Sequence, residues 1–347
     1  MPTHQINTRP RPSRLLWATL AVAAAASWPE SVAAEPLAAN SIQQIVSRSV
    51  SYIDQEGRQW RENRQCASCH RTTFTRWALN RVNERGIEVD PEKLKDWNEW
   101  SEEWTHLLSS DRREDAKQGK TLLGESDAVG QLILGRPARV DHGEWLPTFA
   151  SQLAKAQQED GSWKPGGQLP TQKRKPRETA EVSTMWNLIA LLDHEPSPEI
   201  DPLLDKASAW LGKETRGAST EWWAVKLILR GSLARHRDAA PETAELRAEL
   251  LSRQREDGSW GWLSAEDGDA LGTGIALYAL AKDGLEPSSD PATRAIRFLS
   301  ETQKEDGSWP VPGTKAKAKG RVTETATYWG TCWAVIGMLE LPAMAER

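Results

Sequence analysis

Three copies of one seven-residue motif constrain the fold of this chain more than any other feature. QQEDGSW begins at residue 157, QREDGSW at 254 and QKEDGSW at 303. The last two copies are 49 residues apart, and the first two are 97 apart, which is close to two periods. A period of this length is typical of repeat architectures, in which each unit buries its apolar face against its neighbours.

Each unit is predicted to begin with a helix on the outside. Asp-Pro pairs at residues 90–91, 201–202 and 290–291 place a capping carboxylate before a proline at the first helical position. With the similar starts at Ser41, Pro147 and Pro241, these pairs predict first helices that begin near residues 41, 91, 147, 202, 241 and 291.

A second helix is predicted in each unit, for example over residues 177–192, 269–281 and 323–339. These segments carry fewer charges than the first helices, so they should lie on the inside. The Asp-Gly pair of the motif supplies the turn between the two helices. Six such hairpins form a closed ring in the favoured interpretation and an open solenoid in the alternative.

The pattern Q-x-x-D-G-S-W resembles the QW repeat of squalene and oxidosqualene cyclases and of the related protein prenyltransferase β subunits. The resemblance implies an all-α fold, an (α/α)6 toroid with a central cavity, over a single domain from residue 35 to 347. It further implies that Gln157, Gln254 and Gln303 tie adjacent helix ends together, with Trp163, Trp260 and Trp309 stacked on them. These residues are therefore expected to be structural.

The catalytic motifs of both families are incomplete here, so the sequence leaves enzymatic activity open. Hopene-type cyclases protonate their substrate with an Asp-x-Asp-Asp motif. The nearest stretch, AEDGDALGTG, offers only Asp267 and Asp269, and we expect Asp269 to cap a helix. Prenyltransferases hold zinc with Asp, Cys and His. The similar stretch YWGTCWAVIG retains only Cys332 of these.

The pentapeptide CASCH provides Cys66, Cys69 and His70 in the spacing C-x-x-C-H. This spacing is typical of covalent haem c, because two thiols can add to the vinyl groups while the histidine binds the iron. Met185 and His142 are the candidates for the distal iron ligand. A Cys66–Cys69 disulfide and a zinc site remain as alternatives.

The first 34 residues are predicted to be an export signal. Arg9, Arg11 and Arg14 precede an apolar run at residues 15–26, and small residues end at a cleavage site near Ala34. An uncleaved membrane anchor is the alternative. A periplasmic or otherwise exported location fits the haem prediction, since haem c is attached outside the cytoplasm.

Charge and aromatic content suggest which partners to expect. The net charge of −5 gives no support for binding nucleic acid. Three basic runs near the motif turns predict a basic rim. The rim is either a solvated surface or a contact for the haem propionates, an acidic redox partner or an anionic membrane. These runs contain Arg58, Arg61, Arg64, Lys173, Arg174, Lys175, Arg177, Lys315, Lys317, Lys319 and Arg321.

The chain contains 18 tryptophans. Five of them, Trp186, Trp222, Trp223, Trp329 and Trp333, fall on the predicted inner helices, where some could face the cavity while most are expected to be core.

Three functional hypotheses follow. The first is an exported haem c protein on a cyclase-like toroid, which transfers electrons or oxidises a small hydrophobic ligand in the cavity. The second is a non-redox isoprenoid-binding protein or cyclase-like enzyme, with Cys66 and Cys69 as a disulfide. The third is a structural or partner-binding repeat protein.

Overall fold

The computed structural model describes residue 1 and residues 39–64, 71–107, 126–138, 140, 142–166, 169–194, 200–213 and 216–342. The predicted export signal, apart from Met1, and the C-x-x-C-H motif lie outside the described residues. The described helices belong to one compact unit, Pro36–Arg347. None of them is both long enough and apolar enough to cross a bilayer.

Twelve α-helices in the described part of the chain alternate between an outer and an inner layer. The outer helices are α1 (Ala39–Arg64), α3 (Pro91–Glu102), α6 (Trp145–Lys155), α8 (Asp201–Leu211), α10 (Ala244–Ser252) and α12 (Asp290–Thr302). The inner helices are α2 (Thr72–Glu84), α5 (Ser126–Leu134), α7 (Pro176–His194), α9 (Thr220–His236), α11 (Ala270–Lys282) and α13 (Glu324–Glu340). Short 3-10 helices are η1 (Trp104–Leu107), η2 (Leu169–Thr171) and η4 (Ala316–Ala318).

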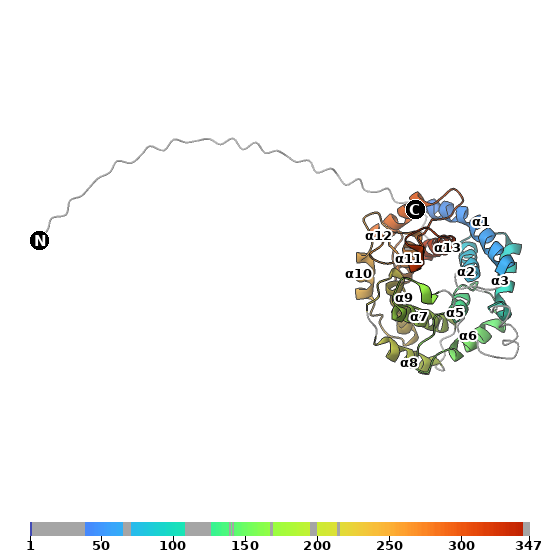
Figure 1. Ribbon diagram of the computed structural model, residues 1–347, viewed down its shortest axis with the longest axis horizontal. Helices are drawn as coiled ribbons and strands as arrows, with labels where there is room; N and C mark the ends of the chain where they lie inside the picture. The colour runs from blue at the N-terminus through green and yellow to red at the C-terminus, as the bar shows by residue number, and fades with distance from the viewer. Residues whose placement is uncertain are drawn as a thin grey trace, which may run out of the picture. The chain divides into compact units, whose positions relative to one another are not determined.

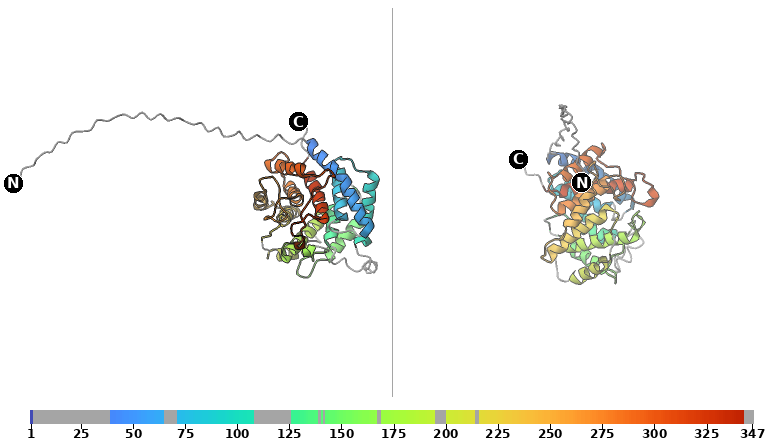
Figure 2. Two further views of the ribbon diagram at one scale, coloured as in Figure 1. Left: turned by 45° about the horizontal axis from the view of Figure 1, so that its top comes forward. Right: turned by 90° about the vertical axis from the view of Figure 1, so that its left-hand side faces the viewer.

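The inner helices close into a ring (Figure 1). Each packs on the next in the order α2, α5, α7, α9, α11, α13, and α13 packs on α2. Figure 2 shows the blue first helix α1 beside the red last helix α13, with which it is in contact. The predicted closed (α/α)6 toroid is therefore confirmed, and the open solenoid is wrong.

Burial explains which helix lies inside. The outer helix α12 buries one stripe, Ala292, Ala295, Ile296 and Leu299, which is the spacing of a single helix face. The inner helix α13 is buried at every position from 326 to 339. A helix that is covered on all sides belongs to the interior of a large domain.

The glutamine of each motif ties one outer helix to the next. Gln157 Nε2 donates to the carbonyl of Leu203 in α8 at 2.9 Å, and Gln254 Nε2 donates to that of Pro291 in α12 at 2.9 Å. Gln303 Nε2 donates to the carbonyl of Ile45 in α1, also at 2.9 Å. The implied role of the three glutamines is confirmed, and the third one closes the ring.

The tryptophan of each motif anchors the preceding outer helix. The indole nitrogens of Trp163, Trp260 and Trp309 each donate at 2.8 Å to a carbonyl there, namely those of Leu153, Leu250 and Leu299. Their backbone N–H groups donate to threonine hydroxyls on the following inner helices, Thr184, Thr273 and Thr331. The motif therefore joins three helices through directed hydrogen bonds.

The predicted helix starts are close to the observed ones. Asp90 caps α3 by accepting from the N–H groups of Glu92 and Lys93, as predicted. The helices α8 and α12 instead begin at Asp201 and Asp290 themselves. Asp269 caps α11 by accepting from the N–H of Gly272 at 2.7 Å, which confirms its expected role.

Candidate functional site

Aromatic rings from four inner helices, α2, α7, α11 and α13, meet near the axis of the ring. Trp333 of α13 lies 5.3 Å from Phe74, 5.4 Å from Trp77, 5.7 Å from Trp186 and 5.6 Å from Tyr278, measured between ring centroids. These contacts are tilted, and their centroid distances lie in the range favourable for aromatic pairs. The centre of the toroid is therefore an aromatic cluster.

Three of the five tryptophans predicted to lie on inner helices, Trp186, Trp329 and Trp333, line this central chamber. The other two do not. Trp222 and Trp223 pack on each other at 4.8 Å and line a groove beside α10.

The rings leave little free space. The central chamber has a volume of about 20 Å³, which is room for one water molecule or little more. The implied central cavity is thus largely filled by side chains. Besides the rings, its lining includes the polar residues Asp127, Gln131, Arg174, Ser183 and Glu221.

Asp127 is the candidate acid of the chamber. It lies in the first turn of α5 and is 4% exposed. Burial raises the pKa of its carboxyl to about 6, although a hydrogen bond from the Gly166 N–H favours the charged form. The Gly166 bond measures 2.8 Å. A carboxyl with such a pKa can carry a proton under mildly acidic conditions.

A buried ion pair lies beside this acid. Arg174 Nη1 donates to Glu221 Oε2 at 2.7 Å, and Trp186 Nε1 donates to Glu221 Oε1 at 3.0 Å. The Arg174 side chain is fully buried and that of Glu221 is 5% exposed. Glu221 thus links the guanidinium to the aromatic cluster.

Several buried donors around the chamber have no acceptor among the described residues. They are Arg174 Nη2 and the indole nitrogens of Trp77, Trp329 and Trp333. Native proteins rarely leave buried donors unpaired, so each such group calls for an explanation. Four donors around one chamber favour a ligand that carries oxygen acceptors.

Two loops cover one end of the chamber. Gln172 of the α6–α7 loop pairs with Lys315 of the α12–α13 loop in an antiparallel bridge, and the Lys173 N–H donates to the Thr314 carbonyl at 2.9 Å. Leu169, in η2 of the first loop, lines the chamber.

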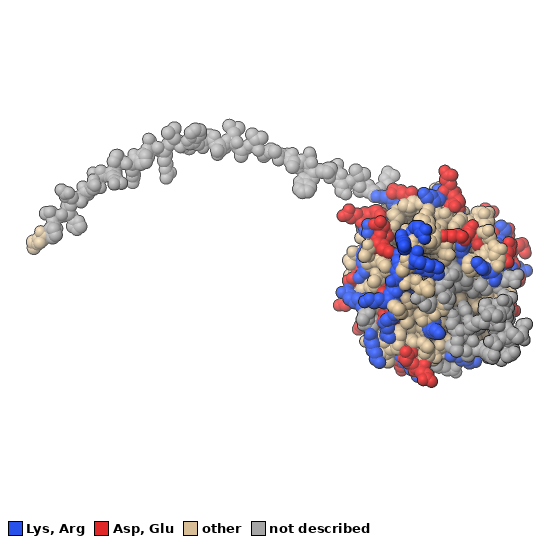
Figure 3. Space-filling model, viewed as in Figure 1, with Lys and Arg blue, Asp and Glu red and all other residues tan. Residues whose placement is uncertain are grey.

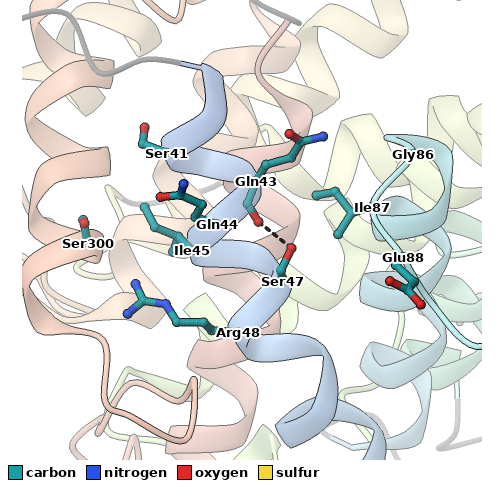
Figure 4. Close-up of a pocket in the computed structure, with 10 residues that line it drawn as sticks. All are labelled: Ser41, Gln43, Gln44, Ile45, Ser47, Arg48, Gly86, Ile87, Glu88 and Ser300. Atoms are coloured by element: carbon teal, nitrogen blue, oxygen red, sulfur yellow. Dashed lines mark hydrogen bonds between the residues drawn. The ribbon is translucent and has the colours of Figure 1, made fainter.

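Larger hollows lie on the outside of the ring. Figure 4 shows one of about 740 Å³, where α1 faces the Gly86–Glu88 segment and the side chains are mostly short and polar. A second of about 760 Å³ lies between α9 and α10. Neither combines a buried acid with several rings, so the central chamber is the stronger candidate.

The prediction of a haem cofactor is contradicted by the structure. Among the described residues, no group of three or more His, Cys, Asp and Glu side chains is placed to hold a metal ion. The described cysteine, Cys332, is buried, and burial raises the pKa of its thiol to about 12.

The predicted haem ligands have other surroundings or lie outside the described part. Cys66, Cys69 and His70 are outside the described residues. Met185 is 1% exposed in the apolar core, and His142 makes an edge-on contact with Trp145 at 5.7 Å. Neither of these two distal candidates lines the central chamber.

Many cations of the predicted basic rim are engaged in ion pairs. Arg58 and Arg61 bind Asp96, Lys173 binds Glu266 and Arg177 binds Glu181. Exposed cations remain in the α12–α13 loop, at Lys317, Lys319 and Arg321. Figure 3 shows lysine and arginine side chains over the middle of the face seen in Figure 1.

This chain is similar to part of two diphosphate synthases. It is 27% identical over 159 residues to drimenyl diphosphate synthase of Streptomyces showdoensis, which covers 42% of this chain and 29% of that protein. It is 32% identical over 132 residues to labda-7,13-dienyl diphosphate synthase of Streptomyces clavuligerus, covering 35% and 23%. The matches thus span about a quarter of each relative. No family model matches the chain.

Among solved structures, the chain is similar to a possible member of the GH105 family from Klebsiella pneumoniae, with a TM-score of 0.55 and 12% identity. The match covers 95% of this chain and 98% of that one. At this identity the similarity shows the fold alone. The fold and the partial similarity to the two diphosphate synthases together fit a terpenoid cyclase-like toroid.

Asp127 is not among the site residues predicted from the sequence. A signal was present, because Ser126-Asp127 directly precedes the apolar run AVGQLIL, as expected at a helix start. That pattern predicts a cap, and only the packing of α5 against α7 turns the carboxyl into a buried group of the chamber.

Proposed function

We propose that this chain binds a linear isoprenoid diphosphate at its central chamber and starts cyclisation by protonating a carbon–carbon double bond. The observation that carries the proposal is that Asp127, with a pKa of about 6, lines the same chamber as the aromatic cluster. The similarity of this chain to two diphosphate synthases supports an isoprenoid diphosphate as the substrate class.

Asp127 would act as the general acid. Its proton moves to one alkene carbon, the π electrons form the new C–H bond, and a cation remains on the other carbon. A second double bond attacks this cation and closes a ring. A base, either water or the ionised Asp127 carboxylate, then takes a proton from a carbon next to the cation and restores an alkene, so the product is an isomer that keeps its diphosphate.

The aromatic rings would stabilise the cation. Trp77, Trp186 and Trp333 present π faces and edges within one cluster. A cation over a desolvated ring gains on the order of 2 kcal/mol. The unpaired donor of Arg174 would bind a diphosphate oxygen.

The test is incubation with farnesyl and geranylgeranyl diphosphate, followed by chromatography for isomers that retain the diphosphate. Asp127→Asn should remove the product while circular dichroism stays unchanged. Asp269→Asn is the matched control, because Asp269 is also buried with a pKa of about 6 but does not line the chamber. Equal activity in Asp127→Asn and the parent protein would contradict the proposal.

The filled chamber favours a second candidate, a toroid whose role is to bind a partner through its surface. The α12–α13 loop suits this role, since a bridge between Pro312 and Val322 closes its base and Val322 is 57% exposed beside Arg321. Exposed cations with an apolar residue among them favour an anionic membrane surface as the partner.

A further inference from the structure

Two short segments form what we call the strap, residues 169–175 of the α6–α7 loop and residues 311–323 of the α12–α13 loop. In the order of the inner ring, α7 and α13 are separated by two helices on either side, so they stand opposite each other. A contact between the loops that precede them must therefore cross the mouth of the ring. Figure 1 shows the green η2 segment in the middle of the ring.

The junction between the two halves of the strap is small. It includes the Gln172–Lys315 bridge and a hydrogen bond from the Lys173 N–H to the Thr314 carbonyl. Each half is better anchored on its own side. The second half closes on itself through the Pro312–Val322 bridge and the bond from the Gly313 N–H to the Arg321 carbonyl, at 2.9 Å.

One buried ion pair holds the first half down. Arg174 points from the strap into the ring, where it binds Glu221 of α9 at 2.7 Å and lies 5.6 Å from the ring of Trp262. Removing one partner of such a pair leaves an uncompensated buried charge, which is strongly unfavourable. An anion that replaces the glutamate would keep the guanidinium paired.

The strap is also part of the chamber. Leu169 and Arg174 line it, and the Gly166 N–H just before the strap donates to Asp127. The opposite end of the ring is tied by stronger links. There, Lys282 binds Glu340 at 2.8 Å and the Arg85 guanidinium donates to the carbonyls of Leu339 and Leu341.

We infer that the strap is the gate of the chamber, which opens when its halves part between Gln172 and Lys315 and Arg174 exchanges Glu221 for an anionic group of the incoming ligand. The identity of that ligand rests on the proposed function. The opening movement does not, because the strap separates an almost filled chamber from solvent whichever ligand enters.

A reversible cross-link tests the gate. Bridged antiparallel residues have Cα atoms about 4.5–5.5 Å apart, which suits a disulfide, so Gln172→Cys with Lys315→Cys should lock the strap when oxidised. Binding of farnesyl diphosphate, followed by tryptophan fluorescence, should slow at least a hundredfold in the oxidised protein and recover on reduction.

Pro312→Cys with Val322→Cys is the matched control. It cross-links the other bridge of the same loop without crossing the mouth, so oxidation should leave binding within twofold of the parent protein. The parent protein passes through the same oxidation and reduction, which accounts for its own cysteines. If the oxidised Gln172→Cys, Lys315→Cys protein bound farnesyl diphosphate at the rate of the parent protein, the strap would not be the gate of the chamber.

Hydrogen exchange tests the role of the Arg174–Glu221 ion pair without any ligand. Glu221→Gln should raise the exchange rate of residues 169–175 and 311–323 at least tenfold. Glu266→Gln is the control, because Glu266 is a partly exposed partner of Lys173, and it should change the rate less than threefold. Unchanged exchange in Glu221→Gln would show that this ion pair does not hold the strap. If farnesyl diphosphate fails to bind even the parent protein while exchange rises as expected, the proposed function fails and the gate stands.

Discussion

Gln303 and Ile45 lie 258 residues apart in the chain, and the amide of the first donates to the carbonyl of the second at 2.9 Å. The same amide nitrogen also contacts Ser49 Oγ at 3.0 Å. Because this contact joins the last outer helix to the first, it closes the ring where no covalent connection does.

Replacing Gln303 should therefore weaken the whole ring. Gln303→Ala removes hydrogen bonds from a half-buried amide and should lower the free energy of unfolding by about 1–3 kcal/mol. Urea denaturation measures the change. Gln55→Ala is the control, because that exposed amide bonds only Ser51 one turn away, and it should change stability by less than about 0.5 kcal/mol. An equal effect of both changes would contradict a ring-closing role.

Gly307 should tolerate no side chain. Its φ is +85°, and an added Cβ would lie 2.0 Å from the carbonyl oxygen of Arg48 in α1. Gly307→Ala should cost about 2–4 kcal/mol, the sum of left-handed strain and displacement of α1.

Gly284 is the matched control for this substitution. Its φ of +81° is similar, but nothing lies within 4 Å of the added Cβ. Gly284→Ala should therefore cost only about 1 kcal/mol, the backbone part alone. Thermal and urea unfolding separate the two effects, and equal losses would show that the close approach to Arg48 is relieved by a small shift.

The stability of Asp127→Asn relative to the parent protein should depend on pH. The folded pKa of about 6 lies above the unfolded value of 3.8, so the folded carboxyl binds its proton more tightly. Its destabilising effect is fully present above pH 6 and disappears as the pH falls towards 3.8. The full effect is about 3 kcal/mol.

Urea unfolding of both proteins at pH 4, 5, 6 and 7 checks this linkage. Asp127→Asn should gain stability over the parent protein as the pH rises from 4 to 7. A difference that stays constant across this range would mean that Asp127 is not a desolvated carboxyl.

Trp333 should be the most costly ring to remove from the centre. It contacts Phe74, Trp77, Trp186 and Tyr278, so Trp333→Ala should destabilise by about 3–5 kcal/mol and leave a cavity. Trp333→Phe retains a ring and should cost less. A small apolar probe such as benzene should raise the melting temperature of Trp333→Ala alone, as expected for an apolar cavity.

The α12–α13 loop should bind anionic membranes if it is a contact surface. Replacing Lys317, Lys319 and Arg321 with alanine should weaken binding to phosphatidylglycerol vesicles by about a hundredfold, or fivefold for each cation. Replacing Lys155, Lys206 and Lys213 on the outer side removes the same charge and should have little effect. Equal losses would point to net charge rather than a local surface.

The ring could be predicted from sequence because its signals repeat. Each motif carries its glutamine, glycine and tryptophan at fixed positions, and each residue has a partner that the period also repeats. The Asp269 cap is equally local, since the carboxylate and the Gly272 N–H that donates to it lie within one turn.

The contents of the ring could not be predicted in the same way. Phe74, Trp77, Tyr278 and Trp333 come from three helices that are far apart in sequence, and helical spacing does not tell which rings meet on the axis. The C-x-x-C-H motif shows the limit of a short motif. Its five residues specify attachment chemistry, whereas a porphyrin also needs a pocket built from distant parts of the chain.

The bond between Gln303 and Ile45 also bears on the order in which the molecule can assemble. During synthesis α1 emerges before the other helices of the ring, whereas its partner at residue 303 and the neighbouring helix α13 follow more than 230 residues after the end of α1. The flank of α1 therefore stays uncovered until the last helices of the ring have been made. Long-range closure of this kind slows folding and extends the time in which a nascent chain is prone to aggregate.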